Sequence, residues 1–237
     1  MIDDLHHRLH HLSTATVSMQ LLKRGLRHVF IGGITPLRDD QPRIAGPAAT
    51  LRFLPYREDL DDPARRGNPE TAQRRAIEET PEGHVLVVET RGEHGGGVLG
   101  DILATRLQAR GVAGLVTDGV VRDADGIRRT GFPAVCAGSA SPASYNVFSD
   151  GDRGLPIAVG GVTVLPGDSI LADGDGAVVI PAALVAEIVA AGEEQEALEA
   201  WIQGEAGTGK SLTGLYPPDE ETLARYRAWQ EGDAPID

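Results

Sequence analysis

The chain of 237 residues has few cysteines, lysines and aromatic residues. Its single cysteine, Cys136, excludes a disulfide within the chain, and the apolar run PAVCAG around it predicts a buried small hydrophobic residue. No apolar run is long enough to span a membrane, and the N-terminus lacks the apolar core of a secretory signal peptide. We therefore expect a cytoplasmic protein without a membrane segment.

Positive charge is also scarce. The chain has 22 Lys and Arg residues against 35 Asp and Glu residues, which gives a formal net charge of −13. A nucleic-acid-binding surface needs clustered basic residues, so this balance argues against a nucleic-acid partner. An acidic surface can still dock on a basic partner protein.

The composition is otherwise that of a globular α/β protein. Hydrophobic residues make up 41% of the chain, and 30 glycines with 15 prolines predict many tight turns between short strands. Closely spaced turns in Leu155–Pro181 indicate short antiparallel strands, which predicts a mixed rather than a purely parallel sheet. We expect a layered α/β sandwich with a single α/β domain over residues 1–203, N-terminal helices included, and a C-terminal linker and helix extension over 204–237.

One stretch combines the strongest structural signals with chemical side chains. His84–Thr90 is an apolar run typical of a buried strand, and glycines 95–97 follow it. A helix is predicted over Asp101–Arg110, and Ala113–Thr117 is typical of the next strand. The glycine loop and the loop Asp118–Asp123 would leave the carboxyl ends of successive strands, where open α/β sheets bind their ligands.

These two loops carry Asp101, Arg122 and Asp123. A helix N-terminus offers unpaired amide groups, an arginine fork fits a carboxylate, and an aspartate is a hard ligand for a divalent cation. The set indicates a site for a small anionic substrate with a metal. The alternative is that Asp101 and Asp123 only cap helices and that Arg122 is a surface residue.

The same residues resemble the family of 4-hydroxy-4-methyl-2-oxoglutarate aldolases and regulator of ribonuclease activity A proteins. That family carries an Asp, twenty further residues and an Arg-Asp pair, and here Asp101 is followed by residues 102–121 and Arg122-Asp123. The runs GGVLGDILA and GLVTDGVVRD also resemble it, with weaker similarity in LSTATVS, AGPAATLRF and PGDSILADGDGAVVIP. The resemblance covers roughly residues 10–200.

The resemblance implies a swivelling-domain-like fold assembled as homotrimers or homohexamers. It implies that Asp123 ligates Mg²⁺ or Mn²⁺ and that Arg122 holds the carboxylate and 2-oxo group of the substrate. Gly100, Asp101, Ile102 and Leu103 would bind substrate through backbone amides, and Asp101 would also hold metal-bound water. A glutamate from a neighbouring subunit would reach the metal, and the acidic cluster Glu193, Glu194, Glu196 and Glu199 does not show which one.

The resemblance leaves two functions open. One is a metal-dependent lyase that cleaves a carbon–carbon bond in a 2-oxo acid, such as 4-hydroxy-4-methyl-2-oxoglutarate or oxaloacetate, to give pyruvate. A Schiff-base mechanism would need a lysine in the site, and the two lysines, Lys23 and Lys210, lie outside this stretch. The other is a non-catalytic regulator that binds a ribonuclease, although no run of residues specifies such a partner.

Other segments give weaker signals. His6 and His10, like His7 and His11, are four residues apart on a predicted helix, which allows a zinc site but is more typical of a solvated face. Residues 139–154 are predicted to form a Ser/Gly/Asp-rich loop, and Ala182–Gln203 a long helix.

Residues Gly204–Ser211 match the phosphate-loop pattern G-x-x-x-x-G-K-[ST]. That pattern binds phosphate only between a strand and a helix, whereas here a helix is predicted before it and prolines follow it. We therefore interpret GEAGTGK as a flexible linker.

Overall fold

The computed structural model describes residues 4–59 and 67–232. The helices are α1 (Asp4–Leu9), α2 (Thr14–Lys23), α3 (Ala72–Glu79), α4 (Asp101–Ala109), α5 (Ala124–Thr130), α6 (Val185–Gly207) and α7 (Glu220–Gln230), with short 3₁₀ turns η2 (Ser144–Asn146) and η3 (Ala182–Leu184). The strands are β1 (Phe30–Ile31), β2 (Thr35–Pro36), β3 (Ile44–Pro55), β4 (Val85–Glu89), β5 (Gly114–Thr117), β6 (Ala134–Cys136), β7 (Phe148–Arg153), β8 (Ile157–Val159), β9 (Val162–Val164), β10 (Ser169–Asp173) and β11 (Gly176–Ile180).

A large mixed sheet organises the chain up to Val189. Its strand order is β1-β11-β10-β3-β4-β5-β6-β2, with β7 paired to β3 outside this path. The neighbours β3, β4, β5 and β6 are parallel, while β10 pairs antiparallel with both β11 and β3. The predicted α/β fold with a mixed sheet is therefore confirmed.

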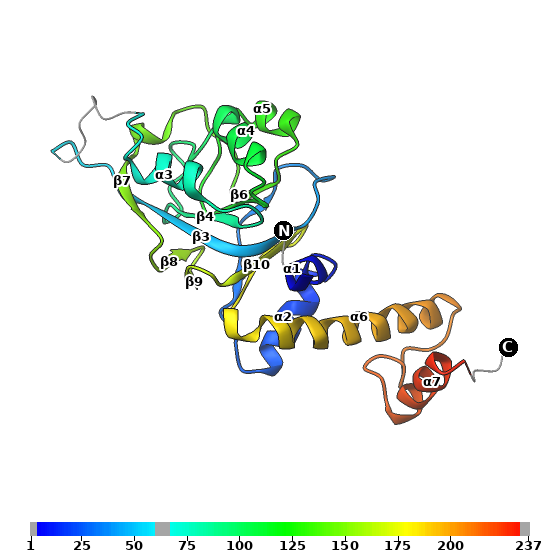
Figure 1. Ribbon diagram of the computed structural model, residues 1–237. Coiled ribbons are helices and arrows are strands. Elements are labelled where there is room, and N and C mark those ends of the chain that lie inside the picture. The colour runs from blue at the N-terminus through cyan, green and yellow to red at the C-terminus, as the bar shows by residue number, and fades with distance from the viewer. Residues whose placement is uncertain (1–3, 60–66, 233–237) are drawn as a thin grey trace. The chain divides into compact units, whose positions relative to one another are not determined.

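Both faces of the sheet are covered, as β4 illustrates. Leu86 and Val88 contribute to the core beneath α3, α4 and α5, whereas Val85 and Val87 face the core shared with the hairpin of β8 and β9. Figure 1 shows the three helices on one side of β3 and β4 and the hairpin on the other. Two buried faces explain why this strand is a continuous apolar run rather than an alternating one.

The N-terminal helices cover the antiparallel end of the sheet. Ser13 caps α2 and accepts a hydrogen bond from the backbone amide of Thr16. Asp173, at the end of β10, accepts hydrogen bonds from the backbone amide and hydroxyl of Thr14. It also accepts one from the backbone amide of Asp175, which agrees with the turn-forming role of aspartate.

The histidines of α1 do not form a metal cluster within the described residues. His6 hydrogen-bonds Ser169 and His10 hydrogen-bonds the backbone carbonyl of Arg43, so the two rings hold the helix against the sheet. Burial lowers the pKa of His10 below its ordinary value, which keeps that ring neutral at physiological pH.

The loop prediction for residues 139–154 is wrong in its second half. Phe148–Arg153 forms β7, which pairs antiparallel with β3 across an irregularity between Arg52 and Leu54. A Cβ at Gly151 would lie 2.0 Å from the carbonyl oxygen of Arg52, so glycine is required where the two strands approach. Pairing with a long neighbouring strand thus overrides the weak strand propensity of Ser, Gly and Asp.

The chain separates into two compact units, Met1–Val189 and Ala190–Asp237. The boundary between residues 203 and 204 that the sequence predicts lies inside α6, which continues to Gly207. The linker interpretation of Gly204–Gly207 is therefore wrong, because an isolated glycine lowers helix stability without preventing a helix. Within residues 4–59 and 67–232, none of the helices combines the length and apolar character needed to cross a bilayer.

Candidate active site

The two loops predicted to form the site lie side by side at the carboxyl edge of the parallel strands. β4 and β5 are parallel neighbours, so the glycine loop after β4 and the loop after β5 leave the same edge. The amide of Val98 donates to the carbonyl of Val120 over 2.8 Å, and the amide of Arg122 donates to the carbonyl of Leu99 over 2.9 Å. These backbone hydrogen bonds continue the parallel pairing into the loops and fix Arg122 beside the start of α4.

Glycine is required where the loops touch. A Cβ at Gly97 would lie 2.5 Å from the backbone nitrogen of Arg122, and a Cβ at Gly100 would lie 2.9 Å from Oδ2 of Asp123. A third glycine, Gly126 in α5, has the carboxylate of Asp101 against it, since its Cβ would lie 2.4 Å from Oδ2. The carboxylate of Asp123 thus lies against Gly100 at the start of α4, and the carboxylate of Asp101 lies against Gly126 in α5.

The capping interpretation of the two aspartates does not hold. Gly100, not Asp101, is the N-cap of α4, and Asp101 is the first helical residue. Asp123 does occupy the N-cap position of α5, but its side chain accepts no capping hydrogen bond. Its backbone has φ 55° and ψ 42°, a left-handed conformation that is uncommon for residues other than glycine and clusters at functional sites.

All the site residues predicted from the sequence line one cavity of about 260 Å³. Gly100, Asp101, Ile102 and Leu103 line it together with Arg122 and Asp123. Because the N-cap of α4 is a glycine, the cap residue has no side chain that could bond the first amides of this helix. The cavity thus combines helix amides, a guanidinium and two carboxylates.

Arg122 and Asp123 present their charged groups to solvent. Each side chain is 45% exposed, and Nε of Arg122 lies 3.6 Å from Oδ2 of Asp123. At this distance the two charges interact without a close hydrogen bond, so both groups remain available to a ligand.

The donor set fits a divalent cation that keeps most of its ligands from solvent or substrate. Within the described residues, no group of three or more His, Cys, Asp or Glu side chains is arranged to hold a metal. Asp123 offers an accessible carboxylate free of capping, and Asp101 lies across the same cavity. A single protein carboxylate with several waters suits Mg²⁺, which gives up its water ligands reluctantly.

Sequence reasoning missed the third wall of the cavity. Gln73 and Arg74 from α3 and Tyr145 from η2 also line it. Gln73 donates to the carbonyl of Val98 over 2.5 Å, which ties α3 to the glycine loop. No local pattern near residue 73 points to a site, because its place depends on packing between segments distant in the sequence.

Comparison with known proteins identifies the family. The family model described as RraA-like: Aldolase/RraA matches residues 14–179. Among solved structures, RraAS2 of Streptomyces coelicolor, described as an unusual member of the RNase ES inhibitor RraA protein family, is 37% identical. It superimposes with a TM-score of 0.76 over 84% of this chain and 96% of its own.

Curated relatives carry two kinds of name. A protein of Halalkalibacterium halodurans named "Putative 4-hydroxy-4-methyl-2-oxoglutarate aldolase" is 31% identical over 62% of this chain and 64% of its own length. Protein DlpA of Legionella pneumophila is 31% identical over 62% of this chain, but the match spans only 23% of that protein. With the family model matched over most of its length, the chain belongs to the RraA-like family.

Proposed function

We propose that this protein is a divalent-metal-dependent lyase that cleaves a carbon–carbon bond in a 2-oxo acid to give pyruvate. The observation that carries this proposal is the convergence of Asp123, Arg122 and the uncapped start of α4 on one cavity. The names of the aldolase relatives support the same reaction class.

The cavity has no amine for covalent catalysis. Its described lining includes neither Lys23 nor Lys210, and Lys210 is paired with Glu205 over 2.7 Å. A Schiff base with the substrate carbonyl therefore has no nitrogen donor in this cavity.

Arg122 and the helix amides bind and orient the substrate. The planar guanidinium of Arg122 offers two parallel donors to the carboxylate beside the 2-oxo group. The first amides of α4, at Asp101, Ile102 and Leu103, add donors and the positive end of the helix dipole. Together they hold the 2-oxo acid in one orientation, which reduces the entropic part of the barrier.

Asp123 would hold the cation, Mg²⁺ or Mn²⁺. When bound, the metal would stabilise the negative charge that develops on the 2-oxo oxygen during cleavage. Asp101 would hold a water molecule and accept, through it, the proton that leaves the 4-hydroxyl group. The bond between C3 and C4 then breaks with its electron pair left on C3, and a proton returned to C3 completes pyruvate. Loss of carbon dioxide from oxaloacetate leaves the same electron pair on C3.

A direct test is pyruvate release from 4-hydroxy-4-methyl-2-oxoglutarate and from oxaloacetate, with Mg²⁺ and after chelation. We expect pyruvate only with the metal. Asp101→Asn should lower the rate strongly while leaving thermal stability unchanged, because an amide cannot accept the proton. Pyruvate formation that is insensitive to chelation, or absent with every 2-oxo acid, contradicts the proposal.

A second candidate function follows from the likeness to RraAS2, whose description names an RNase ES inhibitor family. The net charge of −13 would suit docking on a basic ribonuclease surface. Ribonuclease inhibition by the wild type and equally by Asp123→Ala, without pyruvate release, would favour a binding protein over an enzyme.

The active assembly is proposed to be a homotrimer or homohexamer in which a neighbour completes the site. A cavity with only two carboxylates among its described lining residues leaves room for a further acidic ligand from another subunit. Light scattering at micromolar concentration checks this, and a monomeric mass would contradict it.

A further inference from the structure

Arg74 is a second guanidinium in the proposed active-site cavity. It lies on α3, it is half-buried, and it lines the same cavity as Arg122. The two arginines come from segments almost fifty residues apart, so the cavity collects positive charge from two walls in a chain that is acidic overall.

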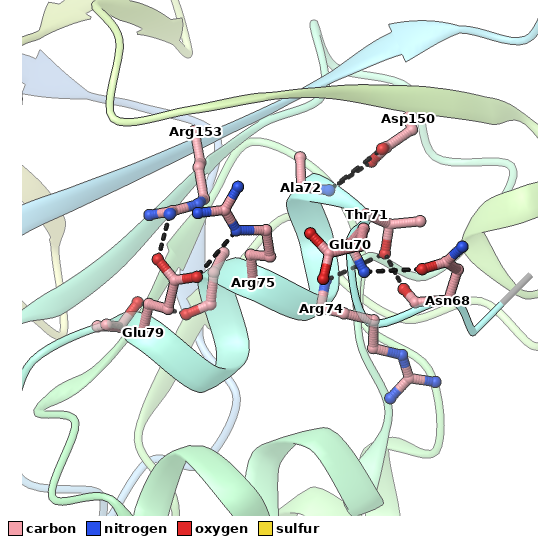
Figure 2. Close-up of polar contacts among 11 residues, drawn as sticks. Asn68, Glu70, Thr71, Ala72, Arg74, Arg75, Glu79, Asp150 and Arg153 are labelled. Carbon is pink, nitrogen blue, oxygen red and sulfur yellow. Dashed lines mark hydrogen bonds and ion pairs between the residues drawn. The ribbon is translucent and has the colours of Figure 1, made fainter. Parts of the chain in front are cut away.

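Among the described residues, Arg75 and Arg153 form close ion pairs, whereas Arg74 acts on Glu78 only through its charge, without a close contact. Arg75 contacts Glu79 over 2.9 Å, and Arg153 of β7 pairs with the same glutamate. The hydrogen bond from Arg75, with the charge of Arg153, holds the pKa of Glu79 below its ordinary value. Within residues 4–59 and 67–232, the guanidinium of Arg74 makes no ion pair or hydrogen bond, and Figure 2 shows it extending away from the Arg75–Glu79–Arg153 cluster.

The backbone that carries Arg74 is fixed on two sides. The carboxylate of Asp150 in β7 accepts hydrogen bonds of 2.9 and 3.1 Å from the amide of Ala72, at the start of α3 (Figure 2). On the other side, Gln73 is tied to the carbonyl of Val98 in the glycine loop. Arg74 therefore stands at a set position relative to the loop that carries the start of α4.

Charge balance indicates what Arg74 would bind. The charged side chains among the described lining residues are Arg74, Arg122, Asp101 and Asp123, whose formal charges cancel. A divalent cation at Asp123 brings the cavity to plus two. A 2-oxo acid with one carboxylate leaves one positive charge unmatched, whereas a 2-oxo diacid carries minus two and matches the cavity.

We propose that Arg74 binds the second carboxylate of a 2-oxo diacid and makes the cavity selective for diacids over monocarboxylates. The inference rests on the proposed function, because Arg122 must take the carboxylate beside the 2-oxo group. The planar fork of Arg74 meets the distal carboxylate, and the half-buried setting makes this charge-assisted contact stronger than one on an open surface.

The test compares binding of two unreactive ligands, 2-oxoglutarate and 2-oxobutyrate, by calorimetry with Mg²⁺ present. Only the first has a distal carboxylate. We expect the wild type to bind 2-oxoglutarate about 10- to 100-fold more tightly, the range for one hydrogen bond between charged groups. Arg74→Gln should lose this preference and leave 2-oxobutyrate binding unchanged.

Arg75→Gln is the matched control, since it removes the same charge one residue away and Glu79 keeps Arg153 as a partner. It should retain the preference. Equal binding of both ligands by the wild type, or equal weakening of both by Arg74→Gln, would overturn the proposal.

Failure of the proposed function gives a different result. In that case neither ligand's affinity falls in Arg122→Ala, and no 2-oxo acid yields pyruvate. If Arg74→Gln weakens the binding of 2-oxoglutarate alone, and Arg122→Ala weakens the binding of both ligands, the inference is supported even for an enzyme that releases pyruvate slowly.

Discussion

Two glycine-rich segments of this chain match ligand-binding patterns, and they differ in what lies against their glycines; the first lines the cavity described above. In the first, a Cβ at Gly97 would overlap the backbone of Arg122, and a Cβ at Gly100 would lie 2.9 Å from the carboxylate of Asp123. In the second, added Cβ atoms at Gly204, Gly207 and Gly209 would meet nothing within 4 Å. A glycine at a binding site is thus distinguished by what lies against it, and not by the spacing of its motif.

The lysine of the second segment is also occupied. Lys210 contacts Glu205, which pairs with Arg225 of α7 as well. The segment between Lys210 and α7 contains no helix, so the N-terminal amides that hold phosphate in a nucleotide-binding loop are missing there. This geometry agrees with the sequence argument that the motif lacks the strand and helix of a phosphate-binding loop.

The largest expected effect in the first segment comes from Asp123→Ala. It removes the protein ligand proposed for the cation, so turnover and Mg²⁺ binding should both be lost. Steady-state kinetics with Mg²⁺ titrated measure the first, and calorimetry measures the second. Asp125→Ala is the control, because Asp125 is a nearby acid that pairs with Arg128 outside the cavity. Wild-type activity in Asp123→Ala would mean that the site lies elsewhere.

Arg122→Ala should lower the rate by about 10²–10³, the usual loss for one charge-stabilising contact. Metal affinity should remain, since the proposed partner of Arg122 is the substrate. Arg122→Lys should restore little activity, because an ammonium group cannot present two parallel donors. Full recovery in the lysine variant would show that charge alone is sufficient there.

A pair of glycine substitutions tests the comparison itself. Gly97→Ala should lower the free energy of unfolding by about 1–3 kcal/mol, because its Cβ would overlap the backbone of Arg122. Gly204→Ala should raise it by about 0.5–1 kcal/mol, since Gly204 is an exposed residue inside α6 and alanine favours a helix. Denaturant unfolding of each variant gives both values. If both substitutions change the free energy of unfolding in the same direction, the two glycine segments do not differ in the way proposed.

The smallest effect is expected for Lys210→Ala. Its exposed ammonium group contributes at most about 1 kcal/mol through Glu205, and catalysis should be unchanged. Equilibrium dialysis with ATP should detect no binding by the wild type. Binding that disappears in the variant would identify the second segment as a nucleotide site after all.

The site loops could be predicted from the sequence because their signals are local. The apolar run of β4, the glycines after it and the acidic start of α4 lie within one continuous stretch, and parallel pairing places the next loop beside it. The roles of Arg122 and Asp123 came from resemblance to a family, since spacing alone allowed simple capping. Their roles in binding and catalysis stay predictions.

The rest depended on contacts between distant segments. β7 has a loop-like composition and becomes a strand only because β3 offers a long partner. Nothing in the sequence of α3 indicated that Arg74 lines the cavity. Its position is set by Asp150 and Val98, which a periodic pattern cannot reveal.

The packing of the two aspartate carboxylates against glycines has a consequence for how the site can evolve. Asp123 lies against Gly100, and Asp101 lies against Gly126. A larger residue at either glycine therefore requires a compensating change at the aspartate that packs on it, elsewhere in the chain. In the wall formed by Gln73, Arg74 and Tyr145, Gln73 is tied to the carbonyl of Val98, whereas the guanidinium of Arg74 has no close ion pair or hydrogen bond among the described residues. New substrate ranges should therefore arise most readily by substitution of Arg74, and a mutant library aimed at altered selectivity should randomise that position while leaving the two aspartates and their glycines unchanged.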